Sequence, residues 1–548
     1  MAREGIKKLI EKAIKELQKP ERGEAKRRVK KSEAHRQAKK LPKFDIPEID
    51  LKHPEERIHG DYATNVAMVI AKQIGKNPLE MANILSLKLK AQSLKLFEKI
   101  EAVSPGFINF FLSEEYLQKE VEKILKEGEK FGQLKIGKNK KIQVEFISAN
   151  PTGPLTIGNA RGGFTGDVLS NVFKKVGFKT EKAYYINDYG MQVLTLGHSV
   201  LKDNQAKYKG DYIDQLNKKI KEKDPYKAGE KAARIIIDRI IKKTVLKMGI
   251  KFDEWISETR LHKSKRVDKA ISILKNKKLV YEKEGAQWFK SSQFGDQRDR
   301  VIIKQDGWKT YLAGDAGLHY YKFTEKKFAK VINIWGADHY GDIPGLQALV
   351  QALGHKGKLD IILLQFVTLL KGGKELRMSK RAGVYVTMDE LLEMVGLDVA
   401  RFFFLQKSGS THLNFDVDLA KEQSAKNPVY YVQYAHARIC SILRKTKIKK
   451  GNKFTGVNLL HHPSELELIK QLIRFPEIIE DTVKDYQVQR LPQYAVDLAT
   501  SFHQFYRDCQ VLTEARPLQE ARTGLILATK IVLKNTLDLM GISAPEKM

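Results

Sequence analysis

A strand-like segment leads into a glycine- and proline-rich loop and then a helix at residues 141–177, and this unit constrains the fold most strongly. Residues 141–148, KIQVEFIS, cluster and alternate β-branched and aromatic side chains as a strand does. The loop NPTGPLTIGNARGG follows, and helical spacing runs from Asn159 to Gly177. A helix N-terminus offers unpaired N–H groups and partial positive charge. The unit therefore predicts either a phosphate-binding loop or an ordinary tight strand-to-helix connection.

Strands and helices continue to alternate after this unit, through segments such as VINIWGADH and IPGLQALVQALG. Alternation of this kind favours a parallel sheet with crossover helices, so we expect a Rossmann-like α/β domain at residues 141–406. A Lys-rich and mostly helical stretch at about residues 203–290 indicates an insertion into that domain. Because a chain of 548 residues is too long for a single core, we expect further domains on both sides.

The two flanking regions differ in their secondary-structure patterns. Residues 1–115 combine helical segments with an alternating strand, which predicts an N-terminal α+β domain, and a linker helix is expected at 116–140. Strand signals fade beyond the sheet domain, so residues 407–548 are expected to form an all-helical bundle. Within it, Ser464 and Glu467 have the spacing of a capping box ahead of a helix. The overall expectation is a multidomain α/β protein.

Basic residues strongly outnumber acidic ones. The chain has 98 Lys and Arg residues against 66 Asp and Glu residues, a formal charge of +32. Such an excess points to a polyanionic partner such as a nucleic acid, although a solubilising surface also explains it. The charge is densest at residues 19–43, where eleven basic residues accompany three acidic ones and apolar residues are few. We expect an exposed basic arm there.

Cysteine usage and hydropathy exclude several classes of protein. The chain holds only Cys440 and Cys509, neither has a second cysteine nearby, and no histidine cluster has the spacing of a zinc site. We therefore expect no disulfide and no structural zinc. The longest apolar stretch, residues 359–370, is too short to span a bilayer, and the N-terminus is a charged amphipathic helix. A soluble, cytoplasmic protein without a membrane partner is expected.

A second loop with phosphate-binding character lies at residues 369–383, LLKGGKELRMSKRAG, where a strand-like run ends in two glycines. Lys374, Arg377, Lys380 and Arg381 offer positive charge to phosphate groups. Taken alone, a basic loop of this kind is usually a solvated surface loop. Together with the first loop, it makes phosphate binding the favoured interpretation.

The two loops carry a family resemblance. R-M-S-K-R at residues 377–381 resembles the Lys-Met-Ser-Lys-Ser motif of class I aminoacyl-tRNA synthetases, and P-L-T-I-G-N occupies the place of their His-Ile-Gly-His motif. The segments VEFISANPTGPL, YYINDYGMQ, TYLAGDAGLHYYK, WGADHYGD and NPVYYVQYAHARI resemble arginyl-tRNA synthetases in particular. Thr156 and Asn159 replace both histidines of the first motif, and these side chains can donate to phosphate without carrying positive charge.

This resemblance implies an arginine–tRNA ligase. ATP, accompanied by Mg²⁺ bound through its phosphates, would activate L-arginine to arginyl adenylate and release pyrophosphate. The arginyl group would then pass to the 2′-hydroxyl of the terminal adenosine of tRNA(Arg), releasing AMP. The N-terminal domain would bind tRNA, the helical bundle would bind the anticodon, and the family default is a monomer. A non-catalytic tRNA-binding paralogue and a nucleotidyltransferase for another small molecule are the alternatives.

The resemblance also assigns roles to individual residues. Catalytic roles fall to Thr156, Asn159, Arg377 and Lys380. ATP contacts fall to Pro151, Gly153, Thr156, Gly158, Asn159, Met378, Ser379 and Lys380. Arginine contacts fall to Glu145, Ser148, Asn150, Tyr311, Asp315, Asp338 and His339. The carboxylates in this set suit a guanidinium and an ammonium. Without the resemblance, Glu145 and Asp315 would be interpreted as a strand-edge acid and a turn aspartate.

Overall fold

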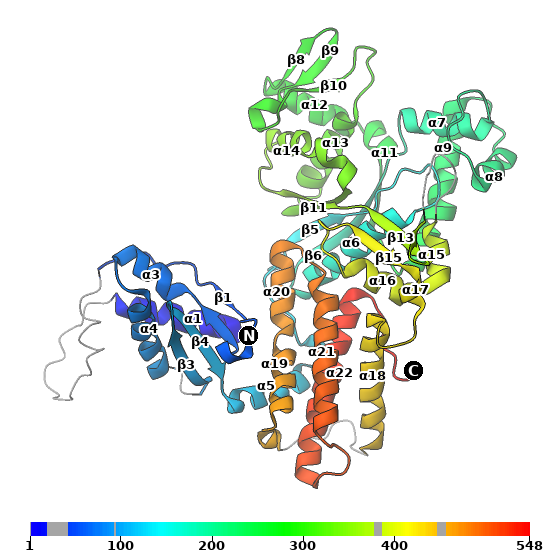
Figure 1. The fold of residues 1–548 in the computed structure, drawn as a ribbon. Helices are drawn as coiled ribbons and strands as arrows, with labels where there is room; N and C mark the ends of the chain where they lie inside the picture. The colour runs from blue at the N-terminus through cyan, green and yellow to red at the C-terminus, as the bar shows by residue number, and fades with distance from the viewer. Residues whose placement is uncertain (1, 19–41, 93–94, 377–385, 447–455) are drawn as a thin grey trace.

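A computed structural model describes residues 2–18, 42–92, 95–376, 386–446 and 456–548. The basic arm predicted at 19–43 lies outside these ranges except for its last two residues. The described residues form an N-terminal α+β part, a central α/β part and a C-terminal helical bundle, as Figure 1 shows. The predicted fold class is therefore confirmed.

The N-terminal part is an antiparallel sheet covered by helices. Its strands, in the order β1-β2-β4-β3, are β1 (Leu51–Lys52), β2 (Tyr62–Thr64), β4 (Phe107–Leu112) and β3 (Phe97–Val103). Its helices are α1 (Ala2–Leu17), α3 (Val66–Ile74) and α4 (Pro78–Gln92). Helix α1 buries Ile6, Ile10 and Ile14, which lie four residues apart and so form one apolar stripe. Helix α5 (Glu114–Glu127) leads from this part to the central sheet.

Five parallel strands form the central sheet, in the order β12-β11-β5-β6-β7. They are β12 (Leu359–Leu364), β11 (Lys330–Gly336), β5 (Lys141–Glu145), β6 (Lys179–Ile186) and β7 (Glu254–Ser257). Each pair of neighbours runs in the same direction. The carboxyl ends of all five strands therefore lie along one edge, which is where open α/β sheets bind ligands.

Helices cover both faces of this sheet. Ile332 and Ile334 of β11 belong to one apolar core, whereas Val331 between them belongs to a second. The first core includes α6 (Ile157–Lys175), and the second includes α13 (Tyr311–Tyr320) and α14 (Ile343–Ala352). Gly166 lets α6 approach the sheet closely, because a Cβ there would lie 2.2 Å from the Phe146 ring.

The insertion expected at about residues 203–290 contains one strand of the central sheet. Residues 254–257 pair in parallel with β6 and form its fifth strand, β7. Four residues, EWIS, are too few to show an alternating pattern, and this explains why the strand was missed. Helices α7 (Met191–Leu201) and α9 (Pro225–Ile236) pack together before β7, and α11 (Glu258–Lys263) and α12 (Arg266–Asn276) follow it. A small antiparallel sheet comes next, formed by β8 (Val280–Lys283), β9 (Ala286–Phe289) and β10 (Arg300–Ile303).

The boundary of the bundle lies later than the expected residue 407. Strand β15 (Leu413–Asp416) pairs in parallel with β13 (Val367–Lys371), which also pairs with β14 (Lys374–Glu375). In the sequence, α15 (Met388–Val395) and α16 (Leu397–Leu405) lie between β14 and β15. The bundle consists of α18 (Pro428–Lys445), α19 (Pro463–Ile473), α20 (Phe475–Asp485), α21 (Arg490–Asp508) and α22 (Arg516–Met540).

The capping box predicted at Ser464 and Glu467 is wrong by two residues. Helix α19 begins at Pro463, and its capping box joins His462 to Glu465. The His462 backbone N–H donates to Glu465 Oε2 at 2.9 Å. Proline is favoured at the first helical position because its φ angle is already helical and its missing N–H is not needed there. The helix therefore starts earlier than the serine signal indicated.

The N-terminal part is attached to the bundle around one buried carboxylate. Glu477 of α20 accepts hydrogen bonds from the Arg3 backbone N–H at 3.1 Å and from the Tyr62 hydroxyl at 2.9 Å. His53 Nε2 lies 2.9 Å from the same carboxylate. Two ion pairs surround this contact at the surface, Lys470–Asp61 and Arg57–Glu467.

A buried charge network joins the central sheet to the bundle. The Arg401 guanidinium on α16 pairs with Asp167 of α6, which also accepts a hydrogen bond from Lys182 Nζ at 2.5 Å. Arg401 donates to the carbonyl oxygens of Met248 at 2.8 Å and of Met540 at 2.7 Å. Met540 ends the last bundle helix, so the Arg401 side chain connects α6 both to the bundle and to the segment that contains Met248.

Replacing Asp167 with Asn should destabilise the fold strongly. The substitution leaves the Arg401 and Lys182 charges buried without a counter-charge, which costs about 3–5 kcal/mol. Urea unfolding measures the change. Asp538→Asn is the matched control, since its ion pair with Lys534 is exposed and should contribute less than about 1 kcal/mol. Equal effects of the two substitutions would contradict a structural role for this network.

Candidate active site

The strand, loop and helix predicted at 141–177 are all present, with β5 ending at Glu145 and α6 beginning at Ile157. Thr156 is the N-cap of α6. Its backbone N–H donates to Asn159 Oδ1 at 3.0 Å, and its hydroxyl donates to the same oxygen at 3.1 Å. The two residues in the histidine positions thus cap the helix and bind each other. The Asn159 N–H donates to the Thr156 carbonyl oxygen at 2.9 Å, and the N–H groups of Ile157 and Gly158 at the start of α6 are suited to an anion.

The turn after β5 is conformationally strained. Ile147 has φ +66° and Ser148 has φ +39°, and a β-branched residue rarely adopts the left-handed region. Such strain costs about 1–3 kcal/mol and persists only where neighbouring contacts fix it. Here Ser148 Oγ accepts the Tyr185 backbone N–H at 3.0 Å, which ties the turn to β6. The turn brings Ser148 beside Glu145, with Ser148 Oγ 3.4 Å from Glu145 Oε1.

The segment after the second loop is paired with the first loop. Thr387 forms an antiparallel bridge with Thr156, and the Met388 N–H donates to the Leu155 carbonyl at 2.9 Å. The predicted residues Arg377, Met378, Ser379 and Lys380 lie outside the described residues. The described chain that follows them therefore lies beside the N-terminus of α6.

The other predicted ATP contacts lie on the first loop. Pro151 is buried, and Gly153 lies against Tyr212, where a Cβ would be 3.1 Å from the Tyr212 hydroxyl. Gly158 is exposed, and among the described residues the only atom within 4 Å of a Cβ placed there is Thr156 Oγ1 at 3.7 Å. The described part of the chain therefore leaves space beside Gly158.

Three carboxylates converge at the carboxyl edge of the sheet. Asp315 lies one turn into α13, and its pKa is raised to about 8 by burial and then by the negative charges of Glu258 and Glu145. Burial and the same three carboxylates raise the pKa of the Tyr185 hydroxyl, which lies among them. Gly314 lets Glu258 approach α13, because a Cβ there would lie 2.7 Å from Glu258 Oε1.

Glu258 was not predicted from the sequence. It is 5% exposed, and its Oε2 is buried without a hydrogen-bond partner within the described part of the chain. A buried acceptor without a partner is costly, so a donor from a ligand would stabilise it. Glu258 directly follows β7, and recognising that short strand would have marked an acid at the ligand-binding edge.

Glu145 differs in that its carboxylate already has a partner. Lys322 Nζ lies 2.6 Å from Glu145 Oε2 and 3.3 Å from Asn333 Oδ1, and the Lys322 side chain is fully buried. One ammonium therefore accompanies the three carboxylates.

The remaining predicted arginine contacts are more exposed. Asn150 is exposed, and Tyr311, one turn before Asp315 on α13, is 60% exposed. Asp338 and His339 follow the carboxyl end of β11, with His339 Nε2 3.7 Å from Asp338 Oδ2 and His339 Nδ1 3.3 Å from Asp342 Oδ2. These two residues share the sheet edge with the carboxylates but contact each other.

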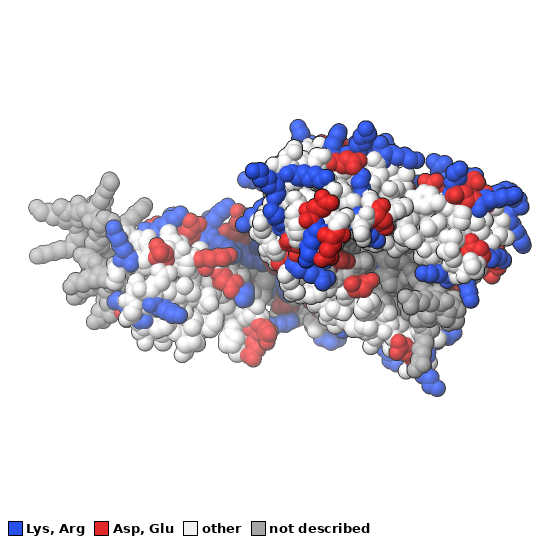
Figure 2. Space-filling view, turned by 90° about the horizontal axis from the view of Figure 1, so that it is seen from above, with Lys and Arg blue, Asp and Glu red and all other residues white. Residues whose placement is uncertain are grey.

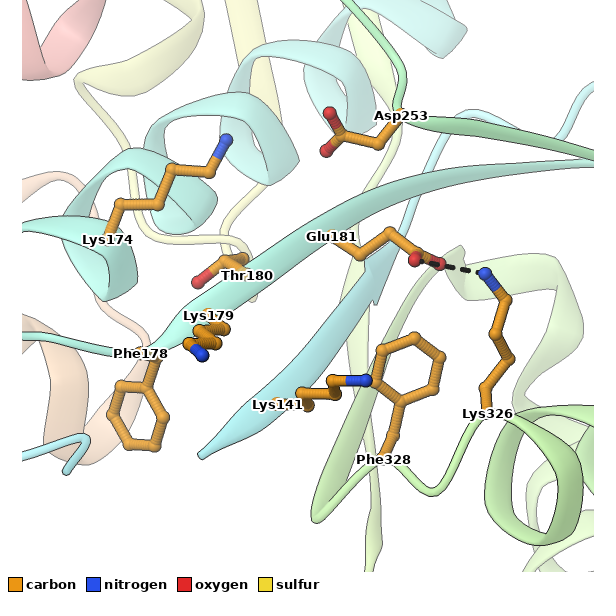
Figure 3. Close-up of a pocket in the computed structure, with 9 residues that line it drawn as sticks. All are labelled: Lys141, Lys174, Phe178, Lys179, Thr180, Glu181, Asp253, Lys326 and Phe328. Carbon is orange, nitrogen blue, oxygen red and sulfur yellow. Dashed lines mark hydrogen bonds and ion pairs between the residues drawn. The ribbon is translucent and has the colours of Figure 1, made fainter. Parts of the chain in front are cut away.

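A cavity of about 450 Å³ lies at the opposite, amino-terminal edge of the sheet and contains none of the predicted site residues (Figure 3). Lys141 and Lys179 line it from the first residues of β5 and β6, and Lys174 lies in the last turn of α6. Lysines at a helix C-terminus offset its partial negative charge. Lys326 pairs with Glu181 at 3.3 Å. Lys174 and Lys326 thus have a structural explanation.

Other predicted features concern metals, thiols and membranes. Cys440 and Cys509 are both free and buried. Within residues that the structure describes, no group of three or more His, Cys, Asp or Glu side chains is placed to hold a metal ion. None of the described helices combines the length and apolarity needed to cross a membrane.

Family models match the three parts of the chain in order. The arginyl tRNA synthetase N terminal domain matches residues 4–112, and the catalytic domain of class I (R) tRNA synthetases matches 120–224 and 203–416. The DALR anticodon binding domain matches residues 432–548.

Whole-chain comparisons agree with these matches. The arginine–tRNA ligase of Geobacillus thermodenitrificans is 42% identical over 532 residues, covering 92% of this chain and 95% of the relative. The arginine–tRNA ligase of Caldanaerobacter subterraneus subsp. tengcongensis is 41% identical over 531 residues, covering 92% of this chain and 94% of the relative. The structure of Thermus thermophilus arginyl-tRNA synthetase has the same fold, with a TM-score of 0.79, 22% identity and full coverage of both chains. The chain therefore belongs to the arginyl-tRNA synthetase family of class I aminoacyl-tRNA synthetases.

Proposed function

We propose that this arginine–tRNA ligase performs both of its steps at the carboxyl edge of the central sheet. L-Arginine attacks the α-phosphate of ATP to give arginyl adenylate and pyrophosphate. The 2′-hydroxyl of the terminal adenosine of tRNA(Arg) then attacks the adenylate and releases AMP. The observation that carries this placement is the convergence of Glu145, Glu258 and Asp315 next to the first loop. The comparisons give no support to a non-catalytic paralogue.

Arginine binds between the carboxylates and the first loop in this proposal. Asp315 and Glu258 face the guanidinium, because a carboxylate and a guanidinium can form two parallel charge-assisted hydrogen bonds. Glu145, with Ser148 and Asn150 beyond it, lies nearer the first loop and receives the α-ammonium. This orientation directs the arginine carboxylate toward ATP. The other proposed contacts are Tyr311, Asp338 and His339.

ATP lies along the N-terminus of α6. Gly158 leaves space for the adenine, and the cap residues Thr156 and Asn159 lie beside the phosphates, with Pro151 and Gly153 completing the loop. The second loop supplies the remaining contacts, from Arg377, Met378, Ser379 and Lys380. Lys380 offsets negative charge that grows on the departing pyrophosphate. Mg²⁺ accompanies ATP through phosphate oxygens.

The tRNA contacts extend over all three parts of the chain. Lys and Arg side chains are spread over the face shown in Figure 2, with smaller acidic groups among them. Residues 1–115 bind the body of tRNA(Arg), the helical bundle binds the anticodon, and the arm at 19–43 adds contacts to phosphates. The enzyme acts as a cytoplasmic monomer.

Asp315→Asn should raise the Michaelis constant for arginine about ten- to a hundred-fold, because a hydrogen bond between charged groups contributes about 1.5–3 kcal/mol. The Michaelis constant for ATP should stay unchanged. Aminoacylation at varied arginine and ATP measures both. Asp306→Asn is the control, since Asp306 only accepts the Trp308 N–H at 3.0 Å in a turn. Normal arginine affinity in the Asp315 variant would remove Asp315 from the site.

Arginine affinity should depend on pH through the same carboxyl group. Guanidinium binding favours the ionised form, so below pH 8 the free site must first release the Asp315 proton. The value of kcat/KM for arginine should rise up to about tenfold per pH unit below pH 8 and level off above it. The charged groups near Asp315 are Glu258, Glu145, Lys322 and Asp342. A flat profile, or a rise that persists in Asp315→Asn, would exclude this titration.

Lys380→Ala should slow adenylate formation more than it weakens ATP binding, because the charge on pyrophosphate develops in the transition state. Single-turnover activation with bound tRNA measures the two effects separately. Thr156→Ala should act in the same direction but more mildly, with a loss of about 1 kcal/mol in stability from the helix cap. A normal single-turnover rate in the Lys380 variant would disprove its role.

A further inference from the structure

Lys322 contacts one of the three carboxylates, that of Glu145, and it follows Asp315 on one continuous helical segment. Helix α13 continues directly into a π-helical turn, Tyr321–Glu325. His319 comes four residues after Asp315, and Lys322 comes three residues after His319, so the three side chains share one face of this helix. Single π-turns are rare and frequently occur at functional sites. The turn places a lysine side chain with no exposed surface in the core next to the candidate site.

The contacts of Lys322 connect Glu145 to the backbone of Asp315. Lys322 Nζ donates to Glu145 Oε2 at 2.6 Å and to Asn333 Oδ1 at 3.3 Å. Asn333 Nδ2 lies 3.4 Å from His319 Nε2, and His319 Nδ1 lies 2.9 Å from the Asp315 carbonyl oxygen. Burial and the positive charge of Lys322 hold the pKa of His319 well below its usual value, so this histidine is neutral.

Lys322 supplies the ammonium of this network, and among the other described residues His262 Nε2 lies 3.8 Å from Glu258 Oε1. The carboxylates of Glu145, Glu258 and Asp315 bring three negative charges when ionised, and Lys322 cancels one of them. The surplus of two matches the guanidinium and the α-ammonium of arginine, while its α-carboxylate is directed away from these groups, toward ATP. Buried charges are stable only when they are matched in this way.

We propose that Lys322 is a positioning residue for arginine recognition, which holds the Glu145 carboxylate in place and sets the surplus negative charge that the bound amino acid neutralises. This role rests on the arginine site proposed above. Lys322 touches neither arginine nor ATP, and it acts through Glu145 and through the field that it exerts on Asp315. An amino acid without a side-chain cation leaves one negative charge unmatched, so the same lysine contributes to specificity.

Lys322→Gln tests this role, because glutamine can still donate a hydrogen bond to Glu145 but carries no charge. Without the ammonium, Asp315 ionises at higher pH. The midpoint of the pH profile of kcat/KM for arginine should therefore move upward, and arginine affinity at neutral pH should fall about tenfold. The Michaelis constant for ATP should stay unchanged. Lys322→Arg keeps the charge and should restore the midpoint.

Lys326→Gln is the matched control, at the residue that directly follows the π-turn. Lys326 forms ion pairs with Glu181 at 3.3 Å and with Glu254 at 3.1 Å on the opposite edge of the sheet. Removing its charge should lower the melting temperature and leave both the arginine affinity and the pH midpoint unchanged.

A Lys322→Gln enzyme with a lower melting temperature but a normal midpoint and arginine affinity would overturn the proposal and make Lys322 purely structural. If that variant does not fold, Lys322→Arg decides. Arginine affinity and a midpoint close to those of the natural enzyme support the proposal, and a folded Arg variant that has lost arginine affinity refutes it. Normal arginine affinity in Asp315→Asn would instead refute the site itself, so the two failures are distinguishable.

Discussion

The ion pair between Arg401 and Asp167 is the constraint on which the rest of the molecule depends. Each of the three guanidinium nitrogens donates a hydrogen bond, to Asp167 and to the carbonyl oxygens of Met248 and Met540. These partners come from the part of the insertion that precedes β7 and from the last bundle helix. Asp167 lies in the middle of α6, whose first turn begins at the candidate ATP loop. The bundle is thereby fixed to the helix on which the proposed chemistry depends.

The active edge combines stored strain with unmatched charge. Ile147 and Ser148 occupy unfavourable backbone conformations, and Glu258 has a buried oxygen without a partner in the described chain. Both features destabilise the empty protein. They are tolerated because the sheet, α6 and α13 hold the edge rigidly from both faces. Binding of the guanidinium and the α-ammonium of arginine relieves the electrostatic part of this cost, so arginine should stabilise the folded enzyme.

Sequence reasoning succeeded where the signal was local. The strand, loop and helix at 141–177 follow from side-chain periodicity, and the three-part fold follows from changes in that periodicity along the chain. It failed where the signal was short, as at β7 and β15, and where a proline moved a helix start, as at α19. The grouping of Glu258 with Asp315 could not be predicted, because they come from different elements and only the folded chain brings them together. Lys322 was missed since a lysine is ordinarily a surface residue.

The attachment of the N-terminal part to the bundle has a mechanical consequence. Its centre is the buried Glu477, which three groups of the N-terminal part contact, while Lys470–Asp61 and Arg57–Glu467 lie at its surface. Dissolved salt screens exposed pairs far more than buried ones. Rising ionic strength therefore releases the outer pairs first and leaves the centre intact. The attachment of the N-terminal part should therefore weaken in steps as salt is added, with the contacts of Glu477 lost last.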